Sequence, residues 1–290
     1  MSSATVLLLG AVAYDPKVVS IWEGFKTYFQ RQGLPFDVVL YTNYERQVEA
    51  LMAGHVAVAW NSPLAWVRTR RMAEAAGLVT HALAMRDSDQ DLTSLILVRS
   101  DSPIHSIADL RGKTIASGAI DSPQARLLPL NHLRRHGIVA GHDAQVRRFD
   151  VLSGKHGDHI GGEREAARAL MRGEVDAACM IDSNHLLFIN EGTLSPGVTR
   201  VLTQTEPYDH CNFTAVGKPG EKLTGSLADF RTLVMSMSYA DPAVRPLFDL
   251  EGLKAWRDGR INRYAALEEA VDALSFYDQS GGIIARDYLY

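Results

Sequence analysis

The sequence predicts an α/β protein of two lobes, each with a mostly parallel sheet and covering helices. Apolar strand-like runs alternate with amphipathic helix-like segments from the N-terminus onward, an order typical of parallel sheets with helices on both faces. A ten-residue unit also recurs: "ALMAGHVAVA" (50–59) and "ALMRGEVDAA" (169–178) agree at Ala, Leu, Met, Gly, Val and the final Ala. Each copy predicts a helix end, a glycine turn and a buried strand, which favours one plan used twice. A chance match between two alanine-rich helix ends is the alternative.

The first lobe begins with strand, helix, strand, helix, strand. Apolar residues at helical spacing after Lys17 predict a helix that stops at Gly33, and Asn43 is a suitable N-cap for the next helix. The predicted elements are strand 5–12, helix 17–33, strand 36–42, helix 43–54 and strand 56–60.

Between the two repeats we expect two more strands and two helices. Ser106 is a suitable N-cap for a short helix, and Asp121, Ser122 and Pro123 mark the start of a longer one. The predicted strands are 92–99 and 113–117, and the chain is predominantly helical from about residue 222.

Composition excludes several classes of protein. The 290 residues are 46% apolar and 22% charged, so the chain can bury a full core and is not a disordered or fibrous protein. A net charge of -4 without a Lys/Arg block predicts no nucleic-acid partner. Two cysteines, Cys179 and Cys211, are too few for a disulfide scaffold and fit a reducing compartment.

The N-terminal apolar run "VLLLGAV" is too short to span a membrane and follows no basic segment. We therefore expect no membrane span and a cytoplasmic protein, or a periplasmic one if a leader was removed.

Polar loops follow the two repeated strands: "WNSPLAW" (60–66) and "CMIDSNH" (179–185). Ligands of open α/β sheets bind outside the carboxyl ends of the strands. We therefore expect the two loops to face each other across a ligand cleft.

Four stretches resemble one family. They are "YERQVEALMAGHVAVAWNSPLAW", "SDSPIHSIADLRGKTIA", "GKHGDHIGGEREAARALMRGEVDAA", and "TEPYDHCNFTAVGK" with "YADPAVRPLF". The pattern looks like the phosphate/phosphite/phosphonate-binding family, the substrate-binding components of ABC transporters with a type II periplasmic-binding-protein fold. The resemblance covers Gly10 to about Tyr264. It implies two α/β lobes joined by two hinge crossovers, with residues 1–97 and 208–290 in lobe 1 and 98–207 in lobe 2.

The resemblance also implies a function and a set of contacts. The chain would bind a small polar or anionic molecule in the interlobe cleft, with no cofactor, and would serve an ABC transporter permease if exported. The alternative is a cytoplasmic enzyme on the same scaffold, acting on a small metabolite. The implied ligand contacts are Tyr14, Asn61, Ser62, Ser122, Gln124, His156, His159, Asp182 and His210.

The stretch "SGKHGDHIGGERE" (153–165) allows three interpretations. His156, His159 and Glu163 form a weak metal motif, since zinc needs three or four ligands. The glycines predict a loop ahead of a helix that starts near Glu163, and the histidines then clamp a ligand. A histidine held by backbone hydrogen bonds is the third interpretation. We favour the ligand clamp and expect no metal.

His159 and Cys211 are the candidate catalytic residues of the enzyme alternative. In an extended crossover, neighbouring side chains point to opposite faces, so we expect His210 to be poorly placed to deprotonate Cys211. His159 is the other candidate base. Arg86 is expected to pair with Asp87 or Asp89 in solvent, and Trp60 and Trp66 to form either an aromatic wall or core.

Overall fold

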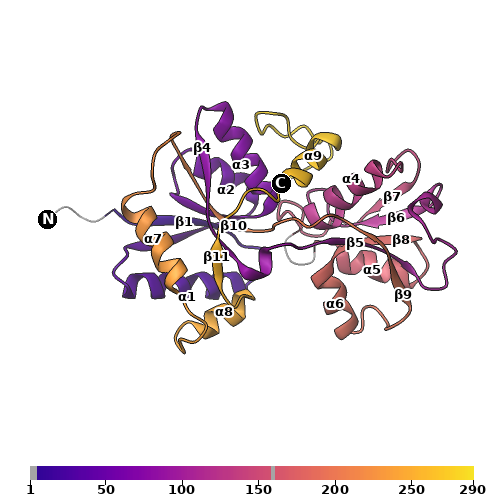
Figure 1. Cartoon of the computed structure of the whole chain (residues 1–290), viewed down its shortest axis with the longest axis horizontal. Coiled ribbons are helices and arrows are strands. Elements are labelled where there is room, and N and C mark those ends of the chain that lie inside the picture. Colours follow the sequence, from indigo (N-terminus) through magenta and orange to yellow (C-terminus); the bar gives the residue numbers. More distant parts are fainter. Residues whose placement is uncertain (1–4, 158–160) are drawn as a thin grey trace. The chain divides into compact units, whose positions relative to one another are not determined.

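The structure is a computed structural model that describes residues 5–157 and 161–290, and it divides into two compact units (Figure 1). Unit 1 runs to Gln90 and continues with Asp209–Asn262 and Gln279–Gly282. Unit 2 comprises Asp91–Tyr208, Arg263–Asp278 and Ile283–Tyr290. The chain therefore passes from one unit to the other after Gln90 and again after Tyr208. Each unit is described on its own.

Unit 1 holds a six-stranded sheet of order β11-β4-β10-β3-β1-β2. Strands β1 to β4 run in one direction, and β10 and β11 run against them. Its strands are β1 (Leu7–Val12), β2 (Phe36–Tyr41), β3 (Val58–Asn61), β4 (Val79–Arg86), β10 (Asn212–Gly217) and β11 (Trp256–Asp258). Its helices are α1 (Lys17–Arg31), α2 (Tyr44–Met52), α3 (Pro63–Ala75), α7 (Gly225–Ser236) and α8 (Arg245–Glu251), with the 3-10 turn η1 (Asp87–Asp89) after β4.

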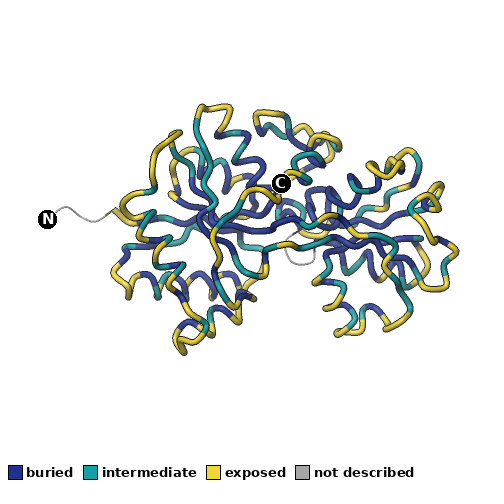
Figure 2. Tube along the Cα trace, viewed as in Figure 1, coloured by how far each residue is buried: buried dark blue, intermediate teal, exposed yellow. Residues whose placement is uncertain are grey.

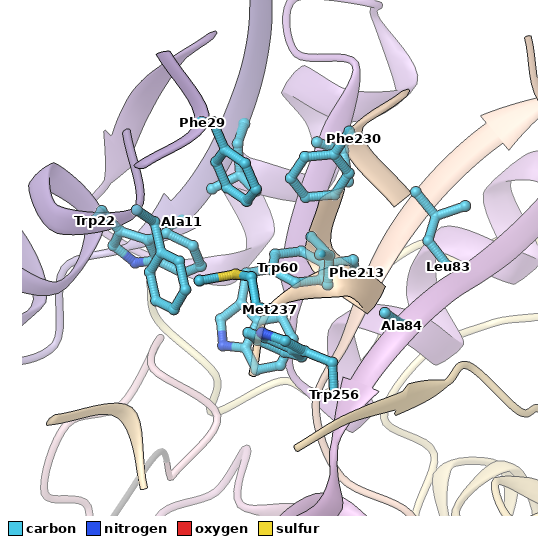
Figure 3. Close-up of a cluster of buried hydrophobic side chains, with 14 of the residues drawn as sticks. Ala11, Trp22, Phe29, Trp60, Leu83, Ala84, Phe213, Phe230, Met237 and Trp256 are labelled. Atoms are coloured by element: carbon cyan, nitrogen blue, oxygen red, sulfur yellow. The ribbon is translucent and has the colours of Figure 1, made fainter. Parts of the chain in front are cut away.

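An aromatic cluster forms the main core of unit 1 (Figure 3). The rings of Trp60 and Phe213 lie 4.7 Å apart between centroids, and Trp256 lies 5.1 Å from Phe213. Helix α1 adds Trp22 and Phe29 from its buried stripe. Aromatic rings packed in offset or edge-to-face arrangements bury a large apolar area. Trp60 and the buried stripe of α1 therefore belong to the hydrophobic core.

Unit 2 holds a five-stranded sheet of order β7-β6-β8-β5-β9. Its strands are β5 (Ser94–Arg99), β6 (Thr114–Ser117), β7 (Gln145–Arg148), β8 (Ala177–Ile181) and β9 (Thr199–Gln204), of which only β5 runs against the rest. Its helices are α4 (Leu128–Arg135), α5 (Glu163–Met171), α6 (Asp182–Asn190) and α9 (Ala265–Ala273). Shorter turns are η2 (Ile107–Leu110) and η3 (Pro123–Leu127), the latter a π-type turn that runs into α4.

Strand β5 shows how the two faces of the unit 2 sheet are covered. Leu95 and Leu97 pack in one cluster with residues of α5, whereas Ile96 and Val98 pack in another with residues of α4. Alternate residues of a strand point to opposite faces, so a continuous apolar run is buried on both sides. The inner strands β5, β6 and β8 are accordingly buried, whereas the edge strands β7 and β9 are partly exposed (Figure 2).

The C-terminal segment of the chain belongs to unit 2. Helix α9 packs against α4 and η3, and Arg134 pairs with Glu269 at 2.7 Å. Residues 263–278 and 283–290 therefore lie in unit 2, whereas the expected lobe 1 contained all of 208–290. The difference arises from long-range packing of an amphipathic helix, which a linear pattern does not reveal.

The recurring ten-residue unit forms the same local structure twice. The turn glycines Gly54 and Gly173 have φ of 73° and 69°, values that favour glycine. The backbone hydrogen bonds match as well. The N–H groups of Gly54 and Gly173 donate to the carbonyls three residues earlier, at 3.1 Å each. The N–H groups of His55 and Glu174 donate to the carbonyls five residues earlier, at 2.9 and 3.0 Å. The same glycine-ended bond pattern also closes α3 at Gly77 and α4 at Gly137, so this geometry alone does not decide between a shared plan and a chance match.

Helix caps lie where the sequence predicts them. The Asn43 side chain accepts the N–H of Arg46 at 2.8 Å, and Ser106 forms a capping box with Asp109. None of the helices in the described part of the chain combines the length and apolar character needed to cross a bilayer.

Candidate functional site

The helix start after β6 is the centre of the candidate site in unit 2. Ser122 is fully buried, and its Oγ accepts the N–H of Ala125 at 3.1 Å. Pro123 follows at the first helical position, which needs no N–H donor. Helix N-termini present backbone N–H groups and a partial positive charge, so they suit anions.

The glycine-rich loop before α5 lies directly against this helix start. Gln124 Nε2 donates to the carbonyl of Gly157 at 2.6 Å, and the N–H of Ala119 donates to the carbonyl of Gly161 at 2.9 Å. A Cβ at Gly157 would lie 2.5 Å from Ser122 Oγ, so only glycine allows this approach. Two segments that are distant in sequence thus form one buried polar cluster.

Asp121 holds the loop in place. Its Oδ2 accepts the backbone N–H groups of Gly154 and His156 at 2.7 and 2.9 Å. Burial raises the pKa of Asp121, while the His156 charge and these N–H bonds act in the opposite direction. Two N–H groups of the glycine loop are therefore bound by this carboxylate. His156 itself is buried with a φ of 53°, and the candidate His159 lies outside the described residues.

Glu163 is a buried acid at the start of α5, where the sequence places the helix start. Its Oε2 accepts from the N–H of Ile181 at 3.0 Å and from Asn184 Nδ2 at 3.0 Å. Burial raises the pKa of Glu163 to about 8, against the hydrogen bonds from Asn184, Ile181 and Gln124. Its Oε1 and that of Gln124 are buried and have no donor among the described residues. With its pKa raised to about 8, the Glu163 carboxyl group holds a proton at neutral pH and can donate a hydrogen bond as well as accept one.

Asp182 at the start of α6 makes local bonds. Its Oδ2 accepts from the N–H and hydroxyl of Thr93 at 3.1 and 2.9 Å, and Oδ1 accepts the N–H of Ser183 at 2.7 Å. The carboxylate thus fastens the end of β8 to the start of β5, as a turn-capping Asp does.

Unit 1 has its own serine-capped helix start after β3. Ser62 Oγ accepts the N–H of Ala65 at 3.1 Å, the bond that Ser122 makes to Ala125. Asn61 Oδ1 accepts from Gln47 at 2.9 Å, and its amide donates to Thr69 at 3.1 Å. Tyr14 is half-buried against the aromatic core. The two helix starts share a sequence pattern, "NSPLA" at 61–65 and "DSPQA" at 121–125. This pattern is a signal for both serine caps that the motifs described above do not include.

The family comparison covers most of the chain. Residues 11–259 match the family described as "ABC transporter, phosphonate, periplasmic substrate-binding protein". The chain belongs to this family. The resemblance that the sequence indicates is therefore confirmed.

Solved structures place the chain in the fold of its family. PhnD1 from Prochlorococcus marinus, in complex with methylphosphonate, aligns with a TM-score of 0.66 at 17% identity, over 93% of this chain and 98% of that one. XAC2383 from Xanthomonas citri, bound to ATP, gives 0.69 at 19% identity over 93% and 98%. The aliphatic sulphonate binding protein SsuA from Escherichia coli gives 0.55 at 19% identity over 99% and 94%. The expected type II α/β fold is confirmed.

Arg86 differs from its expected environment. The sequence predicts a solvent-exposed pair, but Arg86 Nη2 donates to Asp89 at 2.8 Å and Nη1 to Glu251 at 3.1 Å, with all three side chains buried or nearly so. Burial opposes ionisation of Asp89, but the Arg86 charge lowers its pKa to about 2. The guanidinium also lies 5.2 Å above the Trp60 ring. In this member of the phosphonate-binding family, β11 pairs with the end of β4, and Arg86 donates to the Glu251 carbonyl at the end of α8. These two elements shield the Arg86–Asp89 ion pair from water.

His210 and Cys211 also contradict the expectation. His210 Nδ1 lies 3.1 Å from Cys211 Sγ, so the two side chains meet rather than diverge. The alternation rule applies inside a strand, but β10 begins only at Asn212. Trp66 is fully buried, as its helical spacing predicts for a core residue.

Proposed function

We propose that this protein captures a small anionic ligand of the phosphonate type. Family membership over residues 11–259 carries the proposal. The relatives support an oxyanion: methylphosphonate is bound in the Prochlorococcus protein, and the Escherichia coli protein is named for aliphatic sulphonates. The enzyme alternative is not favoured by the family.

The unit 2 helix start supports an anionic ligand. Ser122 supplies a hydroxyl, and the first helical turn supplies N–H groups and the positive end of a dipole. The Asp121 carboxylate accepts hydrogen bonds from the N–H groups of Gly154 and His156. These bonds offset part of its negative charge and so reduce its repulsion of an anion. We assign Ser122, Gln124 and His156 to ligand contact, and a protonated Glu163 keeps this polar cluster from gaining a second negative charge.

The matching helix start of unit 1 supplies the corresponding contact in that unit. Ser62 follows the same Asn/Asp-Ser-Pro pattern and the same cap geometry as Ser122. The further proposed contacts are Tyr14, Asn61, His159, Asp182 and His210.

Calorimetric titration with methylphosphonate, phosphate and ethanesulfonate tests the proposal. We expect methylphosphonate or phosphate to bind, and Ser122→Ala to weaken binding about ten- to hundredfold, the value of one hydrogen bond to a charged group. Ser106→Ala is the control, because Ser106 caps η2 and has an exposed bond to Asp109. Absence of binding by all three oxyanions would refute the proposal, and an unchanged affinity of Ser122→Ala would refute the assignment of that residue.

An ABC transporter permease is the partner that this function requires. The family description is periplasmic, and we propose a periplasmic location rather than the cytoplasmic one that the sequence suggests. Fractionation of native cells locates the protein. Loss of methylphosphonate uptake on gene deletion, restored by the wild-type gene but not by the Ser122→Ala gene, tests the partnership.

A further inference from the structure

A group of three potential metal ligands is buried in unit 1, on elements different from its serine-capped helix start. In residues 5–157 and 161–290, Asp89, His210 and Cys211 place their ligand atoms within 4.8 Å of one another. Asp89 ends η1 directly after β4, and Cys211 directly precedes β10. Strands β4 and β10 are neighbours in the sheet, and the His210 N–H donates to the Asp89 carbonyl at 2.8 Å. The backbone therefore fixes the three side chains together.

The distances between the ligand atoms suit a tetrahedral cation. His210 Nδ1 lies 3.1 Å from Cys211 Sγ and 3.6 Å from Asp89 Oδ1. Zinc bonds of about 2.0–2.3 Å to nitrogen, oxygen and sulfur place neighbouring ligands about 3.4–3.6 Å apart in a tetrahedron. The separations of His210 from Cys211 and from Asp89 thus differ from these values by about half an ångström or less, and all three ligand atoms lie within 4.8 Å of one another.

The charges around these three residues also favour a cation. Arg86 supplies one positive charge, and Asp89 and Glu251 supply two negative charges in the same buried network. A divalent cation together with a Cys211 thiolate makes this group electrically neutral, which lowers the cost of burying its charges. Arg86 Nη2 donates to Asp89 Oδ1 at 2.8 Å, and such outer hydrogen bonds orient a metal-binding carboxylate.

We propose that Asp89, His210 and Cys211 bind a thiophilic divalent cation of the zinc class, with water at the fourth position. A thiolate, an imidazole and a carboxylate form a donor set that suits zinc better than magnesium or calcium. Asp89 lies beside the chain crossing after Gln90, and His210 and Cys211 lie beside the crossing after Tyr208, so the ion would tie these two segments of unit 1 together. The site uses Nδ1 of His210, which is also among the proposed ligand contacts, so its tests use metal ions without any oxyanion ligand.

Cobalt(II) titration of the metal-free protein tests the proposal. Cobalt bound by a thiolate gives a charge-transfer band, which we expect to saturate at one equivalent in the wild type. Cys211→Ser should abolish the band and weaken zinc binding at least about tenfold, the lower range for lost ligand support. Cys179→Ser is the matched control: Cys179 lies in β8 of unit 2, and burial raises its pKa to about 12. Absence of the band in the wild type, or an unchanged band in Cys211→Ser, would overturn the proposal.

A second measurement needs no substitution. X-ray absorption of the zinc-loaded wild type should show one sulfur neighbour at about 2.3 Å together with nitrogen and oxygen neighbours. A shell of nitrogen and oxygen alone would overturn the proposal even if Cys211→Ser fails to fold.

Discussion

Gly157 lies so close to Ser122 that an added Cβ would be 2.5 Å from Ser122 Oγ and 2.6 Å from its Cβ. The two residues are 35 positions apart in sequence, and their contact joins the glycine loop to the helix start. Gly157 also has a φ of 65°. Glycine is therefore required here both by backbone conformation and by space.

We predict that Gly157→Ala weakens ligand binding and destabilises the protein more than a positive φ alone does. Gly141→Ala is the control, because Gly141 has a φ of 86° but no atom within 4 Å of its added Cβ. The control should lose about 1–2 kcal/mol of unfolding free energy and no affinity. Urea unfolding and calorimetry measure both quantities. Equal losses in the two variants would show that the Ser122 contact is unimportant.

Glu163 predicts a pH dependence of stability. Burial raises the pKa of Glu163 from its ordinary value of 4.5 to about 8 in the folded state, so the folded protein holds a proton that the unfolded chain releases in this range. The stability contribution is complete below pH about 4.5 and is lost as pH rises to about 8, by up to about 1.4 kcal/mol per pH unit.

Glu163→Gln removes this dependence because glutamine resembles the protonated acid. We expect the unfolding free energy of Glu163→Gln to vary less between pH 5 and 8 than that of the wild type. Glu165→Gln is the control on the same helix, since Glu165 is exposed and pairs with Arg168. Urea unfolding at several pH values measures the slope. A slope that persists in Glu163→Gln would assign the dependence to another group.

Arg68 and Arg70 on α3 should differ greatly in their effect on stability. Arg68 pairs with Glu45 at 2.6 Å, with 7% and 0% of the two side chains exposed. The pair of Arg70 and Glu74 is 39% and 57% exposed. We predict that Arg68→Met costs about 3–5 kcal/mol, because it removes the cation of a buried ion pair. Arg70→Met should cost less than about 1 kcal/mol.

A double variant separates lost packing from the uncompensated charge at this pair. Adding Glu45→Gln to Arg68→Met should recover part of the loss, since the buried charge is then gone. Chemical unfolding of the three variants gives the free energies. No recovery in the double variant would mean that Arg68 acts through its bonds to the Gly281 and Glu45 carbonyls instead.

Local patterns in the sequence predict the elements of each unit. The alternation of strands and helices, the repeated glycine turn, the Asn43 cap and the start of α5 at Glu163 all rest on neighbouring residues, whose conformations are set by short-range geometry. Ser122 as a helix cap belongs to the same class. These features were therefore open to prediction without a structure.

Features that depend on contacts between distant segments were not predictable in this way. Arg86 is buried because Glu251 and β11 cover it, 165 residues along the chain. His210 contacts Cys211 because both residues precede β10, which begins at Asn212, so strand alternation does not apply to them. The placement of α9 on unit 2 depends likewise on its packing against α4.

Tyr288 lies beyond the family match, which ends at residue 259. Its side chain nevertheless contacts the Asp121 carboxylate, which holds the glycine-rich loop before α5. Its Oη donates to Asp121 Oδ2 at 3.4 Å, and its ring packs 5.0 Å from Phe276. We predict that Tyr288→Ala costs about 3–5 kcal/mol, the usual loss for a buried aromatic ring, and weakens ligand binding. Tyr288→Phe keeps the ring and loses one long hydrogen bond, so it should cost about 1 kcal/mol or less. Leu289→Ala, with 82% of Leu289 exposed, should leave stability and affinity unchanged. Urea unfolding with calorimetry decides the matter, and an unaltered affinity in Tyr288→Ala would show that the C-terminal segment does not support the site.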